Sequence, residues 1–214
     1  MIVTAWPLDG TAARRLSDYA AKRESGSRDV LDGRDLDFRG ADLSSVDLEG
    51  ACVMRATLDG VNFRGAVLSD ADLTDASAAG TCFDGAEVMG AEFAHVNARA
   101  ASFADAELGG LNALESDFSS ANFCGANLRG AVFLECVLTG ADLRGTLLSR
   151  TKFRDSRLDG IQVSGAAGTV IGPSEIAEGV VLDGQELEQW FRDRGADIKV
   201  VPGDPRQDTI TPGG

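Results

Sequence analysis

The hydrophobic residues of the stretch 36–165 recur every five positions. Starting at Phe38 and adding five gives 26 positions, the last of them Val163, with no insertion or deletion between them. These positions, here called rungs, hold 11 Leu, 9 Phe, 3 Val and 3 Ala. The residue two before the rung is small, with Ala in 14 cases, and Gly occurs 14 times two residues after it. The unit therefore reads Ala-(Asp/Asn)-(Leu/Phe)-x-Gly.

Neither of the two standard periods explains this pattern. A helix needs apolar residues at a spacing of 3.6 and a strand at a spacing of 2, whereas here two apolar positions, two residues apart, occur in every five. Each unit is therefore expected to be a very short extended piece followed by a turn, for which Gly and the polar residues are suited. A fixed period repeated this often indicates a solenoid whose coils bury their apolar sides against their neighbours.

The run resembles the pentapeptide-repeat family, as shown by Ala41-Asp42-Leu43, Ala71-Asp72-Leu73, Ala126-Asn127-Leu128 and Ala141-Asp142-Leu143. The resemblance implies an all-β solenoid, the right-handed quadrilateral β-helix of that family, with four units in each coil. Residues 20 apart would then stack on one wall of the coil. On one such wall four Phe rings would follow one another, at Phe63, Phe83, Phe103 and Phe123.

The segments before and after the repeat are expected to form helical caps at both ends of the rod. Residues 1–35 contain a predicted short helix from Thr11, a possible N-cap, to Glu24. The first coil needs a cover for its open apolar end, and this segment is the simplest one. The alternative is a basic helix that contacts DNA, formed by Arg14, Arg15, Lys22 and Arg23.

Residues 166–201 leave the five-residue register. A helix is predicted from Gly184 to Arg194, with apolar residues at helical spacing, and a short strand follows it. The apolar face of this segment could plug the last coil or pack against a second copy across a two-fold axis, and its candidate dimer contacts are Leu187, Trp190, Phe191 and Ile198. Residues 202–214 are expected to be a flexible tail.

Composition argues against an enzyme. The chain has no nucleophile motif, no phosphate-binding loop and no zinc-binding pair of histidines, and a filled rod with flat walls offers no cleft. The single histidine, His95, is expected on the surface without a partner, and the four cysteines follow no metal-ligand spacing. We therefore expect no catalytic residues, no metal and no cofactor. No stretch is apolar enough to span a membrane and no signal peptide is evident, so a cytoplasmic protein is expected.

Charge is unevenly distributed along the repeat. The whole chain carries a formal net charge of −14, and residues 65–128 alone contain ten acidic residues against Arg99, a net charge of −9. From residue 129 to 165 the balance reverses, with six basic and four acidic residues. Stacking at a spacing of 20 places seven of the ten acids on two adjacent walls, which we call the acidic stripe: Asp70, Glu87 and Glu107 on one wall, and Asp72, Asp75, Glu92 and Glu115 on the next.

Two interpretations of the acidic stripe remain open at this point. Surface charge of one sign keeps a protein in solution, and Asp before the rung belongs to the repeat consensus whatever the function. Alternatively, a regular rod with negative charge along its length imitates duplex DNA and competes for a basic DNA-binding groove. Direct binding to nucleic acid is disfavoured because the chain itself is strongly negative.

The family resemblance adds an expected partner. The chain is similar to bacterial members that mimic DNA, bind type II topoisomerases such as DNA gyrase, in some cases protect the enzyme from antibiotics, and dimerise through a C-terminal helical segment. The loop-free run looks more like the mycobacterial quinolone-resistance member than the plasmid-borne proteins with projecting loops. The leading hypothesis is therefore a DNA mimic that binds DNA gyrase or topoisomerase IV. The alternative is a non-catalytic interaction rod with an unrelated protein partner, whose candidate contacts are Met54, Met89, Leu114 and Leu134.

Overall fold

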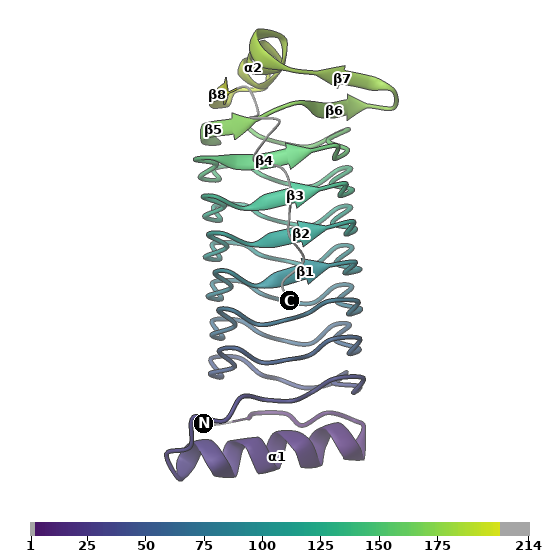
Figure 1. The fold of residues 1–214 in the computed structure, drawn as a ribbon, viewed down its shortest axis with the longest axis vertical. Coiled ribbons are helices and arrows are strands. Elements are labelled where there is room, and N and C mark those ends of the chain that lie inside the picture. The colour runs from purple at the N-terminus through teal and green to yellow at the C-terminus, as the bar shows by residue number, and fades with distance from the viewer. Residues whose placement is uncertain (1–2, 202–214) are drawn as a thin grey trace, which may run out of the picture.

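The chain forms a right-handed quadrilateral β-helix with a helix at each end (Figure 1). The structure is a computed structural model that describes residues 3–201, so the predicted tail at 202–214 lies outside the described residues. Every rung from Phe38 to Val163 is buried, and so is the small residue two before it at every unit after the first. The core is thus a continuous column inside the coils, as the five-residue period predicts.

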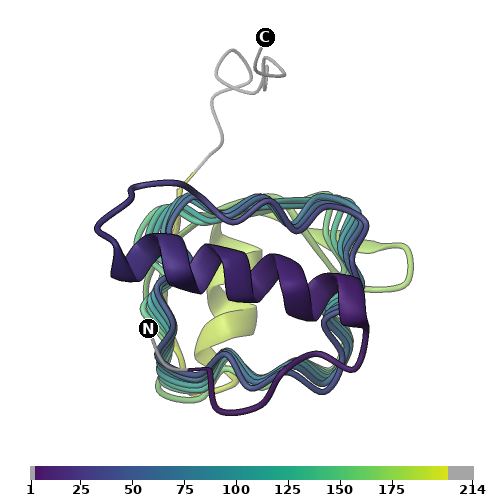
Figure 2. The ribbon, with the colours of Figure 1, turned by 90° about the horizontal axis from the view of Figure 1, so that it is seen from below.

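Parallel bridges join residues 20 apart from one end of the rod to the other, for example Asp42↔Asn62 and Asn62↔Cys82. Each coil therefore contains four units, and the coils superpose as a square when seen along the axis (Figure 2). We number the four walls by their rungs. Wall 1 begins with Phe38 and Leu58, wall 2 with Leu43 and Phe63, wall 3 with Leu48 and Leu68, and wall 4 with Val53 and Leu73.

Wall 4 develops into a true sheet in the C-terminal half of the rod. Its strands are β1 (Glu92–Ala94), β2 (Asn112–Leu114), β3 (Val132–Leu134) and β4 (Thr151–Arg154). They pair in parallel, and the sheet continues through β5 (Ala167–Ile171) to β8 (Asp197–Val201) in the order β1-β2-β3-β4-β5-β8. In the chain, β5 is followed by an antiparallel hairpin of β6 (Ser174–Ala177) and β7 (Val180–Leu182), which the sequence pattern did not predict. The hairpin projects beyond the square outline in Figure 2.

The aromatic stack expected on wall 2 is present. The rings of Phe63, Phe83, Phe103 and Phe123 lie nearly parallel, with centroid separations of 5.2, 4.8 and 4.9 Å and interplanar angles of 5–7°. These separations match the spacing of paired strands, ~4.8 Å, so the ring stack and the backbone ladder share one repeat. Side chains therefore pack directly over their equivalents in the next coil.

Helix α1 (Gly10–Glu24) crosses the open end of the first coil (Figure 2). It buries Ala12, Leu16 and Tyr19 against the core, and the Tyr19 hydroxyl donates to the Asp47 carbonyl at 2.8 Å. The expected N-cap at Thr11 is wrong. The cap is Asp9, whose carboxylate accepts from the backbone N–H groups of Thr11 and Ala12, because a carboxylate one residue before the helix reaches those unpaired donors.

Three of the four basic residues of α1 face acids of the chain itself, and the fourth, Arg14, donates to the Gly10 carbonyl. Arg15 pairs with Asp32, Lys22 with Asp29, and Arg23 with Asp47. A DNA contact through this helix would have to break these pairs. The interpretation of α1 as a cover for the first coil is the one that its burial supports.

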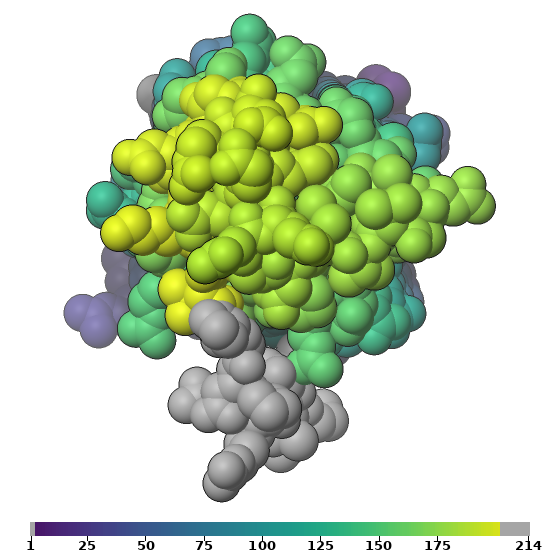
Figure 3. Space-filling model, turned by 90° about the horizontal axis from the view of Figure 1, so that it is seen from above, coloured from purple at the N-terminus to yellow at the C-terminus, as the bar shows by residue number. Residues whose placement is uncertain are grey.

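Helix α2 (Gly184–Arg192) lies over the opposite end (Figure 3). It ends at Arg192, two residues earlier than predicted, and Gly195 follows in the left-handed conformation with φ 76°. Within residues 3–201, neither helix is both long and apolar enough to cross a lipid bilayer.

Candidate functional site

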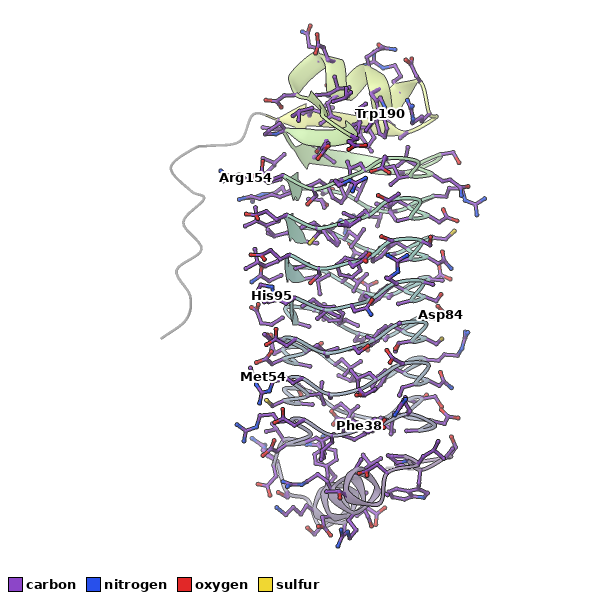
Figure 4. All side chains as sticks on the ribbon, turned by 90° about the vertical axis from the view of Figure 1, so that its right-hand side faces the viewer. Phe38, Met54, Asp84, His95, Arg154 and Trp190 are labelled. Carbon is purple, nitrogen blue, oxygen red and sulfur yellow. The ribbon has the colours of Figure 1, made fainter. Side chains whose placement is uncertain are left out.

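The acidic stripe lies on walls 3 and 4, as the spacing of 20 predicts. Glu87 and Glu107 are bridge partners in adjacent coils of wall 3, and Asp72 and Glu92 are bridge partners on wall 4. All seven members except Asp72 are exposed. Figure 4 shows His95, Met54 and Arg154 along the wall 4 side of the rod, with Asp84 on the opposite side. The stripe is therefore confined to one half of the circumference.

Several of these carboxylates accept hydrogen bonds from the next coil. Glu92 Oε2 accepts from the Asn112 side chain at 2.7 Å, and Glu107 Oε2 accepts from the Asn127 side chain at 2.6 Å. These bonds hold the carboxylates in place along the axis while they stay open to solvent. Glu92 and Glu107 are thus positioned by asparagine side chains of the next coil and not by basic partners.

His95 is exposed, as expected, but the expectation that it lacks a partner is wrong. Its Nδ1 lies 3.7 Å from a carboxylate oxygen of Glu115, because both residues occupy the same position in adjacent coils.

A structural role explains one part of the stripe and leaves another unexplained. The side chain of Asp or Asn before the rung accepts a hydrogen bond from the backbone N–H two residues further on, and this bond forms the turn. Asp72 accepts from the Thr74 N–H at 2.9 Å, and Asp42 accepts from the Ser44 N–H at 3.0 Å. The side chain of Glu is one methylene longer, and no such turn bond is made by Glu87, Glu92 or Glu107. The turn therefore accounts for Asp72, but it does not account for these three glutamates.

The corner after every rung of wall 4 carries a side chain, whereas most of the corresponding corners of the other walls are glycine. The residues at this corner are Asp35, Arg55, Asp75, His95, Glu115, Glu135 and Asp155, and all have φ between 50° and 62°. A left-handed backbone costs a residue with a side chain roughly 1–2 kcal/mol, a cost that Gly avoids. Wall 4 thus accepts backbone strain in every coil and keeps a column that is mostly acidic.

Sequence analysis missed the upper part of this column. Glu135 and Asp155 continue Asp75 and Glu115 upward, although the charge balance of residues 129–165 is positive. A count along the chain averages the walls together and hides the column. Counting every twentieth residue would have revealed it.

The four candidate dimer residues have different environments. Leu187, Phe191 and Ile198 are buried under the chain's own C-terminal cap, so in this conformation they cannot contact a second copy. Their apolar surface plugs the last coil, which is the other use that the sequence left open. Trp190 alone is partly exposed, with the guanidinium of Arg194 stacked 4.0 Å from its ring centroid.

Within the part of the chain that the structure describes, no group of three or more His, Cys, Asp or Glu side chains could hold a metal ion. The model of the pentapeptide-repeat family matches residues 34–60, 54–87, 116–155 and 131–166. The chain belongs to the pentapeptide-repeat family. No curated protein matches this sequence.

Solved structures of other pentapeptide-repeat proteins share the fold. HetL, involved in heterocyst differentiation regulation in the cyanobacterium Nostoc sp. strain PCC 7120, is similar with a TM-score of 0.61 at 24% identity over 65% of this chain and 66% of HetL. Two trypsin-treated forms of QnrB1, a plasmid-mediated fluoroquinolone resistance protein, have TM-scores of 0.62 and 0.57 at 23% and 19% identity, over 78% and 83% of this chain and 79% and 92% of QnrB1. These likenesses establish the fold, which serves proteins of unrelated roles.

Proposed function

We propose that this pentapeptide-repeat protein binds a type II topoisomerase, such as DNA gyrase, through the acidic stripe and acts there as a mimic of duplex DNA. The charge density of the rod carries the proposal. Residues 65–128 hold a net charge of −9 over just over three coils, about 15 Å at ~4.8 Å per coil. This is one net charge per about 1.7 Å, which equals the linear charge density of duplex DNA.

The chemistry of the stripe supports the same function. Glu87, Glu92 and Glu107 stand on regular extended backbone, are exposed and serve no turn, so their charge is available to a partner. A basic groove that binds the phosphates of DNA would meet carboxylates at a regular rise along two adjacent walls. The shared fold with QnrB1 and the resemblance to gyrase-binding members favour a topoisomerase as the owner of that groove, and protection from an antibiotic that acts on it would follow from occupancy of the groove.

The experiment is a supercoiling assay with DNA gyrase, supported by direct binding measured by surface plasmon resonance. Wild-type protein should bind gyrase and alter supercoiling. The triple variant Glu87→Lys, Glu92→Lys, Glu107→Lys should lose both effects, because it nearly neutralises the stripe without touching a turn. The matched control is Asp18→Lys, Glu178→Lys, Glu186→Lys, which changes the net charge equally at exposed positions away from walls 3 and 4.

Equal loss of gyrase binding in both triple variants would show that only total charge matters and would refute the proposed role of the acidic stripe. Absence of gyrase binding by the wild type would leave the second candidate, a non-catalytic interaction rod. The apolar residues Leu114 and Leu134, partly exposed on wall 4, favour that candidate.

Homodimerisation through the C-terminal segment belongs to the proposal only through Trp190, since the other three candidate residues are buried. Trp190→Ala should then halve the mass measured by light scattering while α2 stays folded. An unchanged mass would remove this end-to-end contact from the proposal.

A further inference from the structure

The strands β1 to β4 make one face of the rod unlike the other three. Because side chains alternate along a strand, each strand points two of them outward, one on either side of its buried rung. From β1 upward, the outward pairs are Glu92 and Ala94, Asn112 and Leu114, Val132 and Leu134, and Lys152 and Arg154. The order along the axis is an acidic row, a mixed row of Asn112 and Leu114, an apolar row and a basic row.

The apolar part of this face is partly exposed and has no cover from the described residues. Leu114, Val132 and Leu134 are half-buried and adjacent, since Leu114 pairs directly with Leu134 in register. The neighbouring corner with wall 3 is formed by Gly90, Gly110 and Gly130 beside β1 to β3 and by Arg150 beside β4, so no corner side chain stands above the first three rows on that side. A flat surface can approach this sheet closely.

The order of the rows is self-complementary. If a second copy is turned end for end about an axis that lies in the plane of the face, between β2 and β3, its rows meet those of the first in reverse. The acidic row of each copy then faces the basic row of the other, Leu114 faces Leu134, and Asn112 faces Val132. Each contact occurs twice, as an isologous interface requires.

We propose that wall 4 is a self-association surface on which two copies of this chain pack face to face with antiparallel rod axes. Glu92 of each copy meets Lys152 of the other, and Leu114 meets Leu134. Apolar side chains lie at the centre and charged ones at the rim, the arrangement typical of protein interfaces. The occupant is a second copy because the charge order is complementary to itself when inverted.

One contact opposes the association. At the wall 4 corner, Glu115 of one copy comes opposite Glu135 of the other, and like charges so placed repel. His95 meets Asp155 on the same edge, which is favourable when the imidazole is protonated. The repulsion supplies a gain-of-association test, because reversing Glu135 converts the contact into an attraction.

The face is small, so the dimer belongs to the weak class. Four rows at ~4.8 Å and about four residues of strand give roughly 19 Å by 13 Å, well below the ~800 Å² per partner of a standard stable interface. Association should therefore be measured up to high concentration. The dimer shares Glu92 and Glu115 with the acidic stripe, so a bound topoisomerase and a second copy would compete for wall 4, whereas Leu114, Leu134 and Lys152 serve the dimer alone.

The test is analytical ultracentrifugation of the full chain from about 1 µM to about 500 µM, a range that covers weak dissociation constants. Trp190→Ala, which lacks the proposed end-to-end contact, should pass from monomer to dimer, and the substitutions that follow are compared in this background. Glu92→Lys, Lys152→Glu and Leu114→Lys should each weaken the dimer by about tenfold or more, because each substitution acts twice across the axis. The double variant Glu92→Lys, Lys152→Glu should restore the dimer, and Glu135→Lys should tighten it.

Two variants serve as matched controls. Glu87→Lys makes the same charge reversal at the same repeat position on wall 3, and Ala104→Lys introduces lysine on wall 2 at the repeat position of Leu114. Both should associate like the wild type. Of Glu87→Lys and Leu114→Lys, the first should impair gyrase binding and leave the dimer intact, and the second should do the reverse, so the two proposals fail separately.

Three results would overturn the proposal: a Trp190→Ala protein that stays monomeric over the whole range, a double variant no better than its parents, or wall 4 variants that associate like the wild type while Trp190→Ala does not associate. The last result would mean that copies associate end to end. Small-angle scattering gives the same decision, because an antiparallel side-by-side dimer is much shorter than two rods joined at their ends.

Discussion

Glu87 and Glu107 occupy directly paired positions in adjacent coils of wall 3, with no basic residue between them. Two exposed carboxylates held one coil apart repel each other, so the fold carries an electrostatic cost that its core must offset. In the proposed function, a basic groove on the partner relieves that cost. This relationship connects the stability of the rod to its binding.

Neutralising one member of the pair should stabilise the isolated protein. We expect Glu87→Gln to raise the free energy of unfolding by ~0.2–1 kcal/mol, since like charges directly opposite each other on a sheet destabilise it by about this much. The gain should shrink in 1 M salt, where the screening length falls to ~3 Å. Thermal denaturation at low and high salt measures both effects. Glu178→Gln, in the hairpin turn, should show neither.

The stack of aromatic rings should behave as one unit. Phe103 lies between Phe83 and Phe123 and is fully buried, so Phe103→Ala should cost about 3–5 kcal/mol. Phe103→Leu should cost clearly less because it leaves a smaller void. Urea denaturation followed by far-UV circular dichroism gives these values. A cost for Phe103→Ala below about 1 kcal/mol would contradict close packing of the coils.

One corner column of wall 1 has glycine in one coil and alanine in the next, which allows a reciprocal test. Gly80 and Ala100 follow rungs of wall 1 in adjacent coils, with φ of 64° and 54°. Ala100→Gly should stabilise the fold by about 0.5–1 kcal/mol, because relief of the left-handed strain exceeds the added chain entropy. Gly80→Ala should destabilise it similarly, since its added Cβ meets no atom within 4 Å and only the backbone is affected. Chemical denaturation of both variants decides.

Stability should fall in strong acid at the first coil. The Arg34 guanidinium hydrogen-bonds the Asp32 carboxylate at 2.9 and 3.0 Å and lowers its pKa to about 2. Between the ordinary pKa of Asp, ~3.9, and about 2, the folded protein therefore binds fewer protons than the unfolded chain. The stabilisation by the Arg34–Asp32 contact is complete above this pH range and is lost as the pH falls through it. Arg39 lowers the pKa of Asp37 in the same way.

Asp32→Asn should flatten the acid limb of the stability profile. Denaturant midpoints measured from pH 5 to pH 2, a range that brackets the titration of ordinary and salt-bridged Asp, should fall less steeply in Asp32→Asn than in the wild type. Asp18→Asn, on the exposed face of α1, is the matched control and should follow the wild type. Parallel profiles for all three proteins would show that the Arg34 contact contributes nothing to folding.

The sequence by itself determined the solenoid. The rungs from Phe38 to Val163 had to be buried because no other arrangement of a five-residue period hides one large side chain per unit, and the stack from Phe63 to Phe123 followed once four units made a coil. The acidic residues of walls 3 and 4 were predictable from the same spacing, because the repeat runs without an insertion.

Only the tertiary structure decided which of these residues serve the fold and which are left over. The Asp72 carboxylate forms a turn hydrogen bond and the Glu87 carboxylate does not. The two side chains differ by one methylene, and the consequence of that difference is evident only from the hydrogen bonds. Burial of Leu187, Phe191 and Ile198 likewise depended on where the chain turned after its last coil, since a helix face of this kind fits a rod end and a second copy equally well. The complementary order of rows on wall 4 exists only in three dimensions, because its members are separated by 20 residues and its neighbours in the chain point inward.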